Sequence, residues 1–353
     1  MKTRAGSRWT GIIYAALAAA LFGASTPFAK VLLGATEPVL LAALLYLGSG
    51  VGLTIWLVIN RWLRTSSNEA NLSRSDLPWL AGAITAGGIV APVLVLFGLS
   101  LTAASTASLL LNLEGVLTTL LAWFVFRENF DRRIALGMLF IAIGGVVLSW
   151  AGKPELGLPW GAILIVGACL MWAIDNNLTR KVSATDPMQI AALKGLIAGT
   201  VNFTIALMTG ARFPAGSAIP AAGIVGFLGY GISLTFFVLA LRYIGTARTG
   251  AYFSLAPFIG ALISILFLGD ALTASFIVAA FLMSVGVYLH LTEHHEHKHT
   301  HVSLEHDHKH MHDDHHQHVH APDQTSTEPH SHPHRHEELT HVHDHFPDIH
   351  HQH

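Results

Sequence analysis

Residues 107–128 read ASLLLNLEGVLTTLLAWFVFRE, and residues 251–270 read AYFSLAPFIGALISILFLGD. Each stretch is close to the roughly 20 apolar residues that a helix needs to cross the hydrocarbon core of a bilayer. Apolar side chains occupy every side of both stretches and do not alternate with polar ones, which excludes the strands of a membrane barrel and favours membrane helices.

Apolar runs of this kind fill the chain up to residue 291. Short gaps with Pro, Gly and charged residues separate them, as expected of turns between helices. The sequence therefore predicts an all-α polytopic membrane protein with ten transmembrane helices. The predicted spans are residues 10–33, 38–59, 78–99, 103–126, 133–150, 159–179, 187–208, 219–240, 249–268 and 273–291.

The two quoted stretches belong to a longer internal repeat. An offset of 142 residues aligns Leu113 with Leu255 and Gly144 with Gly286. An offset of 150 aligns Phe22 with Trp172, and an offset of 149 aligns Glu37-Pro38 with Asp186-Pro187. We call this pairing the repeat alignment. Each copy holds five predicted spans, so the second copy enters the membrane from the opposite side. Two inverted five-helix repeats are a recurrent plan of secondary transporters.

The predicted organisation has five parts. We expect, in order, a cytoplasmic N-terminus at 1–9, a first five-helix repeat at 10–150, an extracytoplasmic linker at 151–158, a second five-helix repeat at 159–291 and a tail at 292–353. The positive charges before the first span could indicate a cleaved signal peptide. Because this span has a partner within the chain, we interpret it as a retained helix.

Charge and histidine content divide the chain near His290. Residues 1–289 carry 17 basic and 10 acidic side chains and no histidine, whereas residues 290–353 carry 3 basic and 12 acidic side chains and all 24 histidines. With the N-terminus in the cytoplasm, the cytoplasmic segments hold thirteen Lys and Arg and the outer loops two. The positive-inside rule therefore predicts a protein of the inner cell membrane with both termini in the cytoplasm.

Three stretches resemble one known family. LFGASTPFAK at residues 21–30 and the two stretches quoted first are similar to EamA-type members of the drug/metabolite transporter superfamily, and the resemblance covers residues 10–290. It implies ten helices, a central cavity and the transport of small metabolites, often outward. Position 115 is Gly, where the family commonly has Pro, whereas Pro257 keeps the Pro in the ninth span. The resemblance therefore does not predict whether the fourth span is kinked as in the family.

Glu114 lies midway along its predicted span, two residues after Asn112. An ionisable group at this depth is costly and marks a functional candidate. Burial favours the protonated carboxyl, so Glu114 could couple transport to protons. It could equally receive a cationic substrate or form a structural hydrogen bond to a neighbouring helix.

A second polar patch consists of Asp175, Asn176 and Asn177. At 1.5 Å per residue, Asp175 lies about 8 Å from the inner end of its span, and Lys194 about 10 Å inward from Pro187. The two side chains should therefore lie at a similar depth and face each other or share one cavity. They could belong to the transport pathway or form a purely structural ion pair.

The first repeat carries Ser25, Thr26 and Pro27 at the matching positions. Pro27 removes a helical hydrogen bond and can leave carbonyl groups free for a ligand. Trp172 and Tyr252 are candidates for an aromatic wall, together with Tyr230 and Phe253, although ordinary packing also explains them. Lys30, at the outer end of its span, is expected to extend its amine to the interface.

No phosphate-binding loop and no pairing of a nucleophile with a base is found in the sequence. We therefore expect a protein that is not an enzyme, requires no cofactor and takes its energy from a proton or substrate gradient. Asp186-Pro187 is typical of a helix start, and Glu128 and Asp270, at matching helix ends, are interpreted as structural.

The tail is predicted to be disordered and to bind divalent metal. Its composition is too polar to form a core. Histidine at alternate positions and an excess of acids favour zinc, nickel, cobalt or copper, held at several weak sites and lost as the pH falls below about 6.5. A tail without a metal role is the alternative. The candidate ligands are His306, His308, His310, His312, His315, His316, His318, His320, His330, His332, His334 and His336.

Three functions remain after these steps. The first is a secondary transporter of small metabolites whose tail senses or buffers metal, and the second is a divalent metal transporter whose tail collects cargo. The third is a membrane-anchored metal store. The spans contain no histidine and few carboxylates, which favours the first. Expected partners are the lipid bilayer, a small solute and metal ions, with no nucleic acid; a homodimer is left open.

Overall fold

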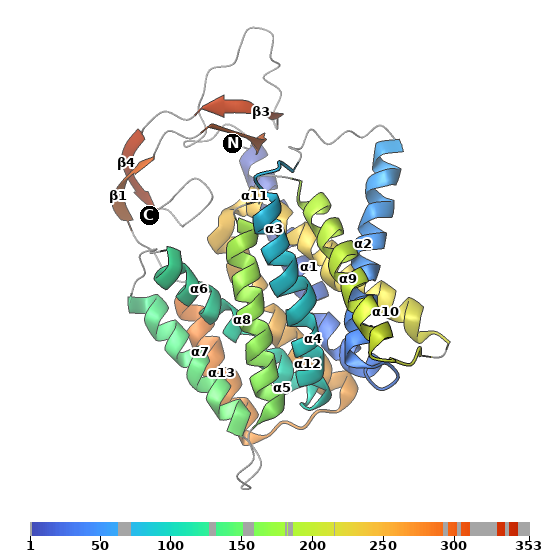
Figure 1. Ribbon diagram of the computed structural model, residues 1–353. Coiled ribbons are helices and arrows are strands. Elements are labelled where there is room, and N and C mark those ends of the chain that lie inside the picture. Colours follow the sequence, from blue (N-terminus) through green and yellow to red (C-terminus); the bar gives the residue numbers. More distant parts are fainter. Residues whose placement is uncertain are drawn as a thin grey trace.

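The computed structural model describes most of the first 291 residues and four short segments of the tail. The described ranges are 2–62, 72–126, 132–150, 159–180, 182, 186–214, 216–291, 296–301, 305–310, 330–335 and 339–344. Up to residue 291 the described chain is a bundle of helices (Figure 1). The expected all-α membrane body is confirmed.

Fifteen helical segments build the bundle within the described part of the chain. They are α1 (Lys2–Leu32), α2 (Pro38–Trp62), α3 (Leu77–Ala83), η1 (Ile84–Val90), α4 (Ala91–Ser100), α5 (Ala104–Leu110), α6 (Leu113–Phe126), α7 (Arg132–Trp150), α8 (Trp160–Arg180), α9 (Pro187–Met208), α10 (Ala218–Gly226), η2 (Phe227–Ile232), α11 (Ser233–Phe253), α12 (Ala256–Leu268) and α13 (Ala274–Leu291).

Eight of the described helical stretches are long and apolar enough to cross a membrane. They match the first eight predicted spans, and two shorter apolar helices, Ala256–Leu268 and Ala274–Leu289, follow them. The predicted gap at 241–248 is wrong, because α11 continues through it to Phe253. This segment contains no Pro, the residue that most strongly ends a helix. The break lies instead at Ser254–Leu255.

The helix starts follow their local sequence. The Asp186 carboxylate accepts a hydrogen bond from the Met188 N–H at 2.9 Å, and Pro187 takes the first helical position of α9. This arrangement satisfies one of the free N–H groups at a helix start. Asp76 differs, because its carboxylate accepts from the Ser73 N–H in the preceding turn.

Two π-helical segments interrupt matching helices. The segment η1 separates α3 from α4, and η2 separates α10 from α11. In the repeat alignment, Ile84 and Val90 of η1 correspond to Gly226 and Ile232. A π-helical turn loosens the regular hydrogen-bond ladder, and such turns are frequent at functional sites.

Close glycine contacts join helices from the two halves of the chain. The helix α7 packs along α13, α2 along α9 and α5 against α12. A Cβ atom on Gly144 would meet Met283 at 2.8 Å, and one on Gly286 would meet Ile141 at 2.7 Å. The repeat alignment pairs Gly144 with Gly286 and Ile141 with Met283, so each contact maps onto the other when the halves are exchanged.

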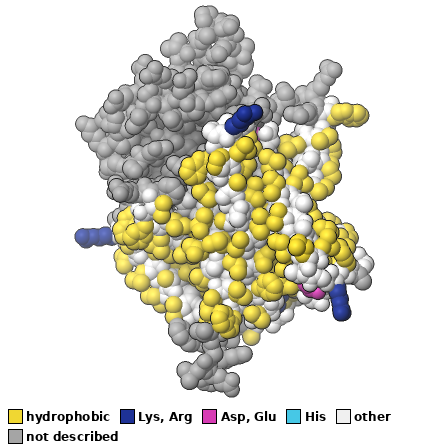
Figure 2. Space-filling view, in the orientation of Figure 1, with side chains coloured by type: hydrophobic (Ala, Val, Ile, Leu, Met, Phe, Trp, Pro, Cys, Tyr) yellow, Lys and Arg dark blue, Asp and Glu magenta, His cyan; other side chains and the backbone are white. Residues whose placement is uncertain are grey.

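The outside of the bundle is apolar. A broad hydrophobic face covers the described helices, and Lys and Arg side chains lie at its edges (Figure 2). Trp62, Phe124 and Phe267 are among its exposed large side chains. An apolar surface of this extent indicates contact with lipid or with another protein.

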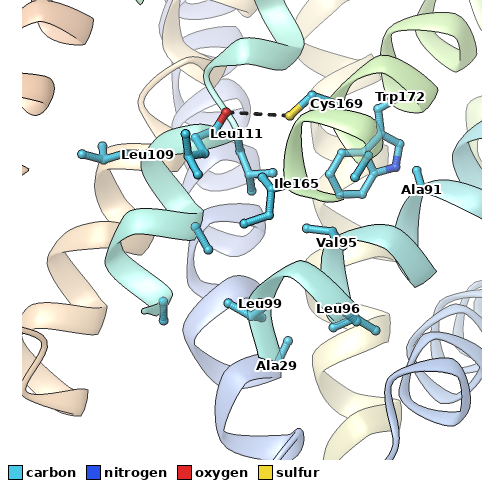
Figure 3. Packing of buried hydrophobic residues seen from close by; sticks show 14 of the residues in the cluster. Ala29, Ala91, Val95, Leu96, Leu99, Leu109, Leu111, Ile165, Cys169 and Trp172 are labelled. Atoms are coloured by element: carbon cyan, nitrogen blue, oxygen red, sulfur yellow. Dashed lines mark hydrogen bonds between the residues drawn. The ribbon is translucent and has the colours of Figure 1, made fainter. Parts of the chain in front are cut away.

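Inside the bundle, a core of Leu, Ala and Val side chains joins α1, α4, α5 and α8. Ala29, Val95, Leu99 and Ile165 fill the space between these helices (Figure 3). Trp172 lies at the end of this core, beside Ala91 (Figure 3).

The described tail segments are strands, which differs from the predicted disorder. The strand β1 (Glu296–His301) pairs with β4 (Leu339–Asp344), and β2 (Glu305–His310) pairs with β3 (His330–Arg335), both antiparallel. Alternation of histidine with other residues has the period of two that suits a strand.

Candidate functional site

The charged centre of the bundle is an ion pair between α8 and α9. The Lys194 ammonium donates to both carboxylate oxygens of Asp175, at 2.6 and 2.7 Å. The Thr179 hydroxyl donates to the same carboxylate at 2.7 Å. Both ionic partners are buried, so the pair satisfies two charges that would be costly alone.

The prediction that Asp175 and Lys194 face each other is confirmed. The prediction used the constant rise per residue of a helix to place both side chains at the same depth. It held because α8 and α9 are each continuous. Asp175 also lies against η1, because any Cβ atom on Gly87 would collide with its carboxylate. The role of the pair in transport stays a prediction.

The Gly87 carbonyl oxygen, in η1, accepts two side-chain hydrogen bonds. The Tyr46 hydroxyl donates to it at 2.8 Å and the Trp172 indole N–H at 3.1 Å. Tyr46 lies 5.4 Å from Tyr230 between ring centroids, and Phe22 lies 6.2 Å from Trp172. An aromatic cluster therefore surrounds the buried ion pair.

Glu114 lies just after a break in the predicted fourth span. The helix α5 ends at Leu110, a turn covers Leu111 and Asn112, and α6 starts at Leu113. Glu114 thus occupies the first turn of α6, where the positive end of the helix dipole stabilises a carboxylate. Cys169 of α8 donates to the Leu110 carbonyl at 3.7 Å, beside the break (Figure 3).

A polar contact joins Glu114 to α8. The Asn176 amide donates to Glu114 Oε1 at 2.8 Å and to the Thr118 hydroxyl at 3.4 Å. Asn176 is exposed and Glu114 is half-buried. Asp175 and Asn176 are adjacent on α8, so the ion pair and the Glu114 contact lie next to each other.

Discontinuous helices, paired repeats and charges near mid-span are the features of a membrane transporter. The model of the EamA-like transporter family matches the chain twice, over residues 9–150 and 159–292. The chain belongs to this family. It is therefore a multi-pass membrane transporter.

Several known proteins are similar to this EamA-like transporter. An "Uncharacterized transporter" of Methanothermobacter thermautotrophicus is 29% identical over 296 residues, which cover 80% of this chain and 86% of that protein. A "Probable amino-acid metabolite efflux pump" of Salmonella typhimurium is 27% identical over 205 residues, which cover 53% of this chain and 67% of that protein. A solved crystal structure shares the fold, with a TM-score of 0.60 at 19% identity over 80% of this chain and 95% of that chain.

The remaining predicted pathway residues of this EamA-like transporter lie in different places. Asn177 and Asn112 are buried and donate to the carbonyl groups of Ala173, at 2.9 Å, and of Leu109, at 3.1 Å. Tyr252 packs against a separate small cluster that includes Ala15, in the N-terminal half of α1. It is therefore not part of the aromatic cluster beside Gly87.

The polar patch of α1 is turned inward. The Ser25 hydroxyl donates to the Phe22 carbonyl at 2.6 Å, and Thr26 is buried. Pro27 does not end α1, which continues to Leu32. The Ser25 hydroxyl thus bonds within its own helix and also lies beside Tyr230 of η2, whereas Asn176 reaches across to α6.

Lys30 binds the end of a neighbouring helix, and the placement of its amine at the membrane interface stays a prediction. Its ammonium donates to the carbonyl groups of Leu99 at 2.6 Å and Thr102 at 2.9 Å, at the carboxyl end of α4. The last carbonyls of a helix lack the regular amide partner four residues on, so a lysine caps them favourably; the Leu99 carbonyl also accepts the Thr102 N–H at 3.4 Å. Asp270 accepts from the Ser105 N–H at 2.8 Å, which confirms its structural role; Glu128 lies outside the described residues.

Sequence reasoning missed Tyr46 and Phe22. A single aromatic in an apolar span is indistinguishable from ordinary core, and only the position of the Gly87 carbonyl reveals the role of Tyr46. The signal was the glycine pair at 87–88, which allows close approach.

The predicted metal ligands of the tail divide into two groups. His306, His308, His310, His330, His332 and His334 lie on the described strands β2 and β3, where histidines stand opposite each other in the register. His312, His315, His316, His318, His320 and His336 lie outside the described residues. Within the described part of the chain, no group of three or more metal-ligating side chains is found.

Proposed function

We propose that the chain is a secondary transporter that exports small metabolites by alternating access, built from ten membrane helices in two inverted five-helix repeats. The observation that carries the proposal is that contacts between helices recur when the two halves are exchanged. Gly87 contacts Asp175, and Gly229 contacts Ser25. The repeat alignment pairs Gly87 with Gly229 and Ser25 with Asp175, so one contact is the image of the other.

The repetition extends to whole elements. The helix α1 packs against α11 and α12 in the way that α8 packs against α4 and α6. A pseudo-twofold axis relating two such halves provides two states of similar energy, open to either side of the membrane. In the proposed transport cycle, each half adopts the conformation of the other, and the opening moves from one side of the membrane to the other.

The pathway is proposed to follow the polar residues near the centre. It comprises Glu114, Asn112, Asp175, Asn176, Asn177, Lys194, Ser25, Thr26, Pro27 and Trp172, with Tyr252 nearer one end. The direction is supported by the similarity to an efflux pump. A proton or substrate gradient supplies the energy, since the sequence lacks a nucleotide-binding loop.

The tail is proposed to bind divalent metal as a sensor or buffer on the cytoplasmic side of the inner membrane. The support is compositional, with 24 histidines after residue 289 and a net excess of acids. Neutral imidazole is a common ligand of zinc, nickel and copper. We expect metal to be released as the pH falls below about 6.5.

The test compares the full-length chain with residues 1–290 in proteoliposomes. Both versions are assayed with a panel of radiolabelled amino acids, amines and sugars, and with zinc and nickel. We expect metabolite exchange in both versions, and an effect of metal on it only with the tail present. Metal flux that survives removal of the tail, or exchange of no metabolite, would contradict the proposal.

A further inference from the structure

The surroundings of Glu114 differ from those of its counterpart in the second half. The repeat alignment pairs Glu114 with Ala256, which is fully buried. A Cβ atom on Gly23 would collide with the Ala256 carbonyl, so α1 and α12 touch backbone to backbone. The residue aligned with Gly23 is Ala173, whose side chain occupies the corresponding place on α8.

The space beside Gly115, the residue that follows Glu114, is open. A Cβ atom on the neighbouring Gly115 would have no atom within 4 Å, and Gly115 and Asn176 are both exposed. A carboxylate and an amide at mid-span do not face lipid at low cost, and such groups line the bundle interior or a watery path. Glu114 therefore lies at an accessible polar surface within the membrane.

Glu114 is the one carboxyl group of this polar region that has no described cationic partner. Lys194 is held by Asp175 through both carboxylate oxygens, which neutralises that pair. Among the residues that the structure describes, no ion pair to Glu114 is found. Its carboxylate has one hydrogen bond, from Asn176, at one oxygen. In its ionised form, Glu114 therefore adds one negative charge that no described cation neutralises, and this charge disfavours an anion nearby.

Aromatic side chains stand close to this charge. Trp172 lies one turn before Asn176 on α8, and Tyr46 shares the Gly87 carbonyl with Trp172. Aromatic faces attract organic cations and provide an apolar surface for the rest of a ligand. A carboxylate with an aromatic wall is the chemistry that recognises an ammonium group attached to an apolar body.

We propose that Glu114 binds the ammonium group of the transported solute, and that the substrates are small organic amines. The inference rests on the proposed function and names the substrate class of the same pathway. The carboxylate forms the ionic contact, Asn176 orients it, and the aromatic cluster contacts the apolar part. An acid of the same size without the amine is repelled.

The experiment measures binding to the purified full-length protein by titration calorimetry. The probes are phenethylamine, phenylalanine and 3-phenylpropionate, which share a phenyl group and differ in charge. We expect phenethylamine to bind and 3-phenylpropionate not to bind. Glu114→Gln keeps an oxygen for Asn176 but loses the charge, and should weaken the binding of phenethylamine about tenfold or more.

Controls separate a binding role from a structural one. Glu114→Asp should restore part of the affinity, and Glu37→Gln, which changes a carboxylate at the start of α2, should leave it intact. An unchanged unfolding midpoint of Glu114→Gln shows that the protein is folded. The proposal is overturned by equal affinity of Glu114→Gln and wild type, by tighter binding of 3-phenylpropionate, or by no binding of phenethylamine to the wild type.

Transport in proteoliposomes distinguishes the two proposals. If wild type and Glu114→Gln exchange metabolites equally, the amine assignment fails while the transporter stands. If phenethylamine binds through Glu114 but no solute moves across the membrane, the amine site stands while the proposed transport function fails.

Discussion

The two membrane-spanning halves share their packing but not their chemistry. Gly87 and Gly229 both let a helix of the other half approach closely. Asp175, Lys194, Tyr46 and Trp172 are linked to Gly87 by contacts and hydrogen bonds. The residues that the repeat alignment pairs with these four are Ser25, Leu45, Gly195 and Phe22. The comparison teaches that a repeated scaffold fixes the geometry, and that charges and donors on one side alone distinguish the halves.

The largest expected effect comes from removing one partner of the ion pair. Lys194→Leu introduces the residue type of the aligned Leu45 and leaves Asp175 buried without a cation. We expect it to lower the free energy of unfolding by about 3–5 kcal/mol. The double variant Asp175→Ser with Lys194→Leu copies both residues of the first half and should recover most of this loss. Thermal unfolding in detergent measures both, and a double variant as unstable as the single one would contradict the comparison.

Gly23→Ala tests the packing at the closed interface. The added methyl group would meet the Ala256 backbone, which cannot rotate away, so we expect a loss of about 1–3 kcal/mol in unfolding free energy. The matched control is Gly167→Ala on α8, where the nearest side-chain atom of Leu94 lies at an ordinary 3.5 Å. Equal stability of the two variants would show that the close approach of α1 and α12 is not required.

Tyr46→Phe removes the hydroxyl that donates to the Gly87 carbonyl, beside the ion pair. The Gly87 carbonyl keeps its bond from Trp172, so the loss should be about 0.5–1.5 kcal/mol, the net value of one hydrogen bond. The same unfolding assay applies. A loss as large as that of Lys194→Leu would mean that the hydroxyl supports the ion pair as well.

The smallest effect is expected at Gly115. Because the space beside it is open, Gly115→Ala should leave the unfolding free energy unchanged or raise it by at most about 1 kcal/mol through helix propensity. The measurement is the unfolding midpoint relative to wild type. A clear destabilisation would show that another group fills this space.

The sequence predicted most of the bundle, because a long apolar run without polar alternation satisfies its backbone in a bilayer only as a helix. It also predicted the Asp175–Lys194 contact, since a straight helix converts residue number into depth. The contact between Glu114 and Asn176 was not predicted. The direction of Glu114 depends on the break at Leu111–Asn112, which no Pro or Gly marks.

The π-helical segments were also beyond prediction. Their residues, such as Gly87 and Gly88, are typical of close helix packing, and the extra residue in the turn leaves no mark in the hydrophobic pattern. The position of the carbonyl that Tyr46 and Trp172 share followed from this detail. Local sequence therefore predicted which residues are polar and that Asp175 meets Lys194, but not the contacts that depend on a helix break or a π-helical turn.

The shared carbonyl of Gly87 has a consequence for how the sequence can change over time. One acceptor with two donors remains satisfied when either donor is lost. Tyr46 or Trp172 can therefore be replaced singly while the backbone of η1 stays paired, and the shape and polarity of the aromatic wall can vary one residue at a time. Replacement of both at once leaves a buried acceptor unpaired, so the route from one substrate preference to another passes through single changes.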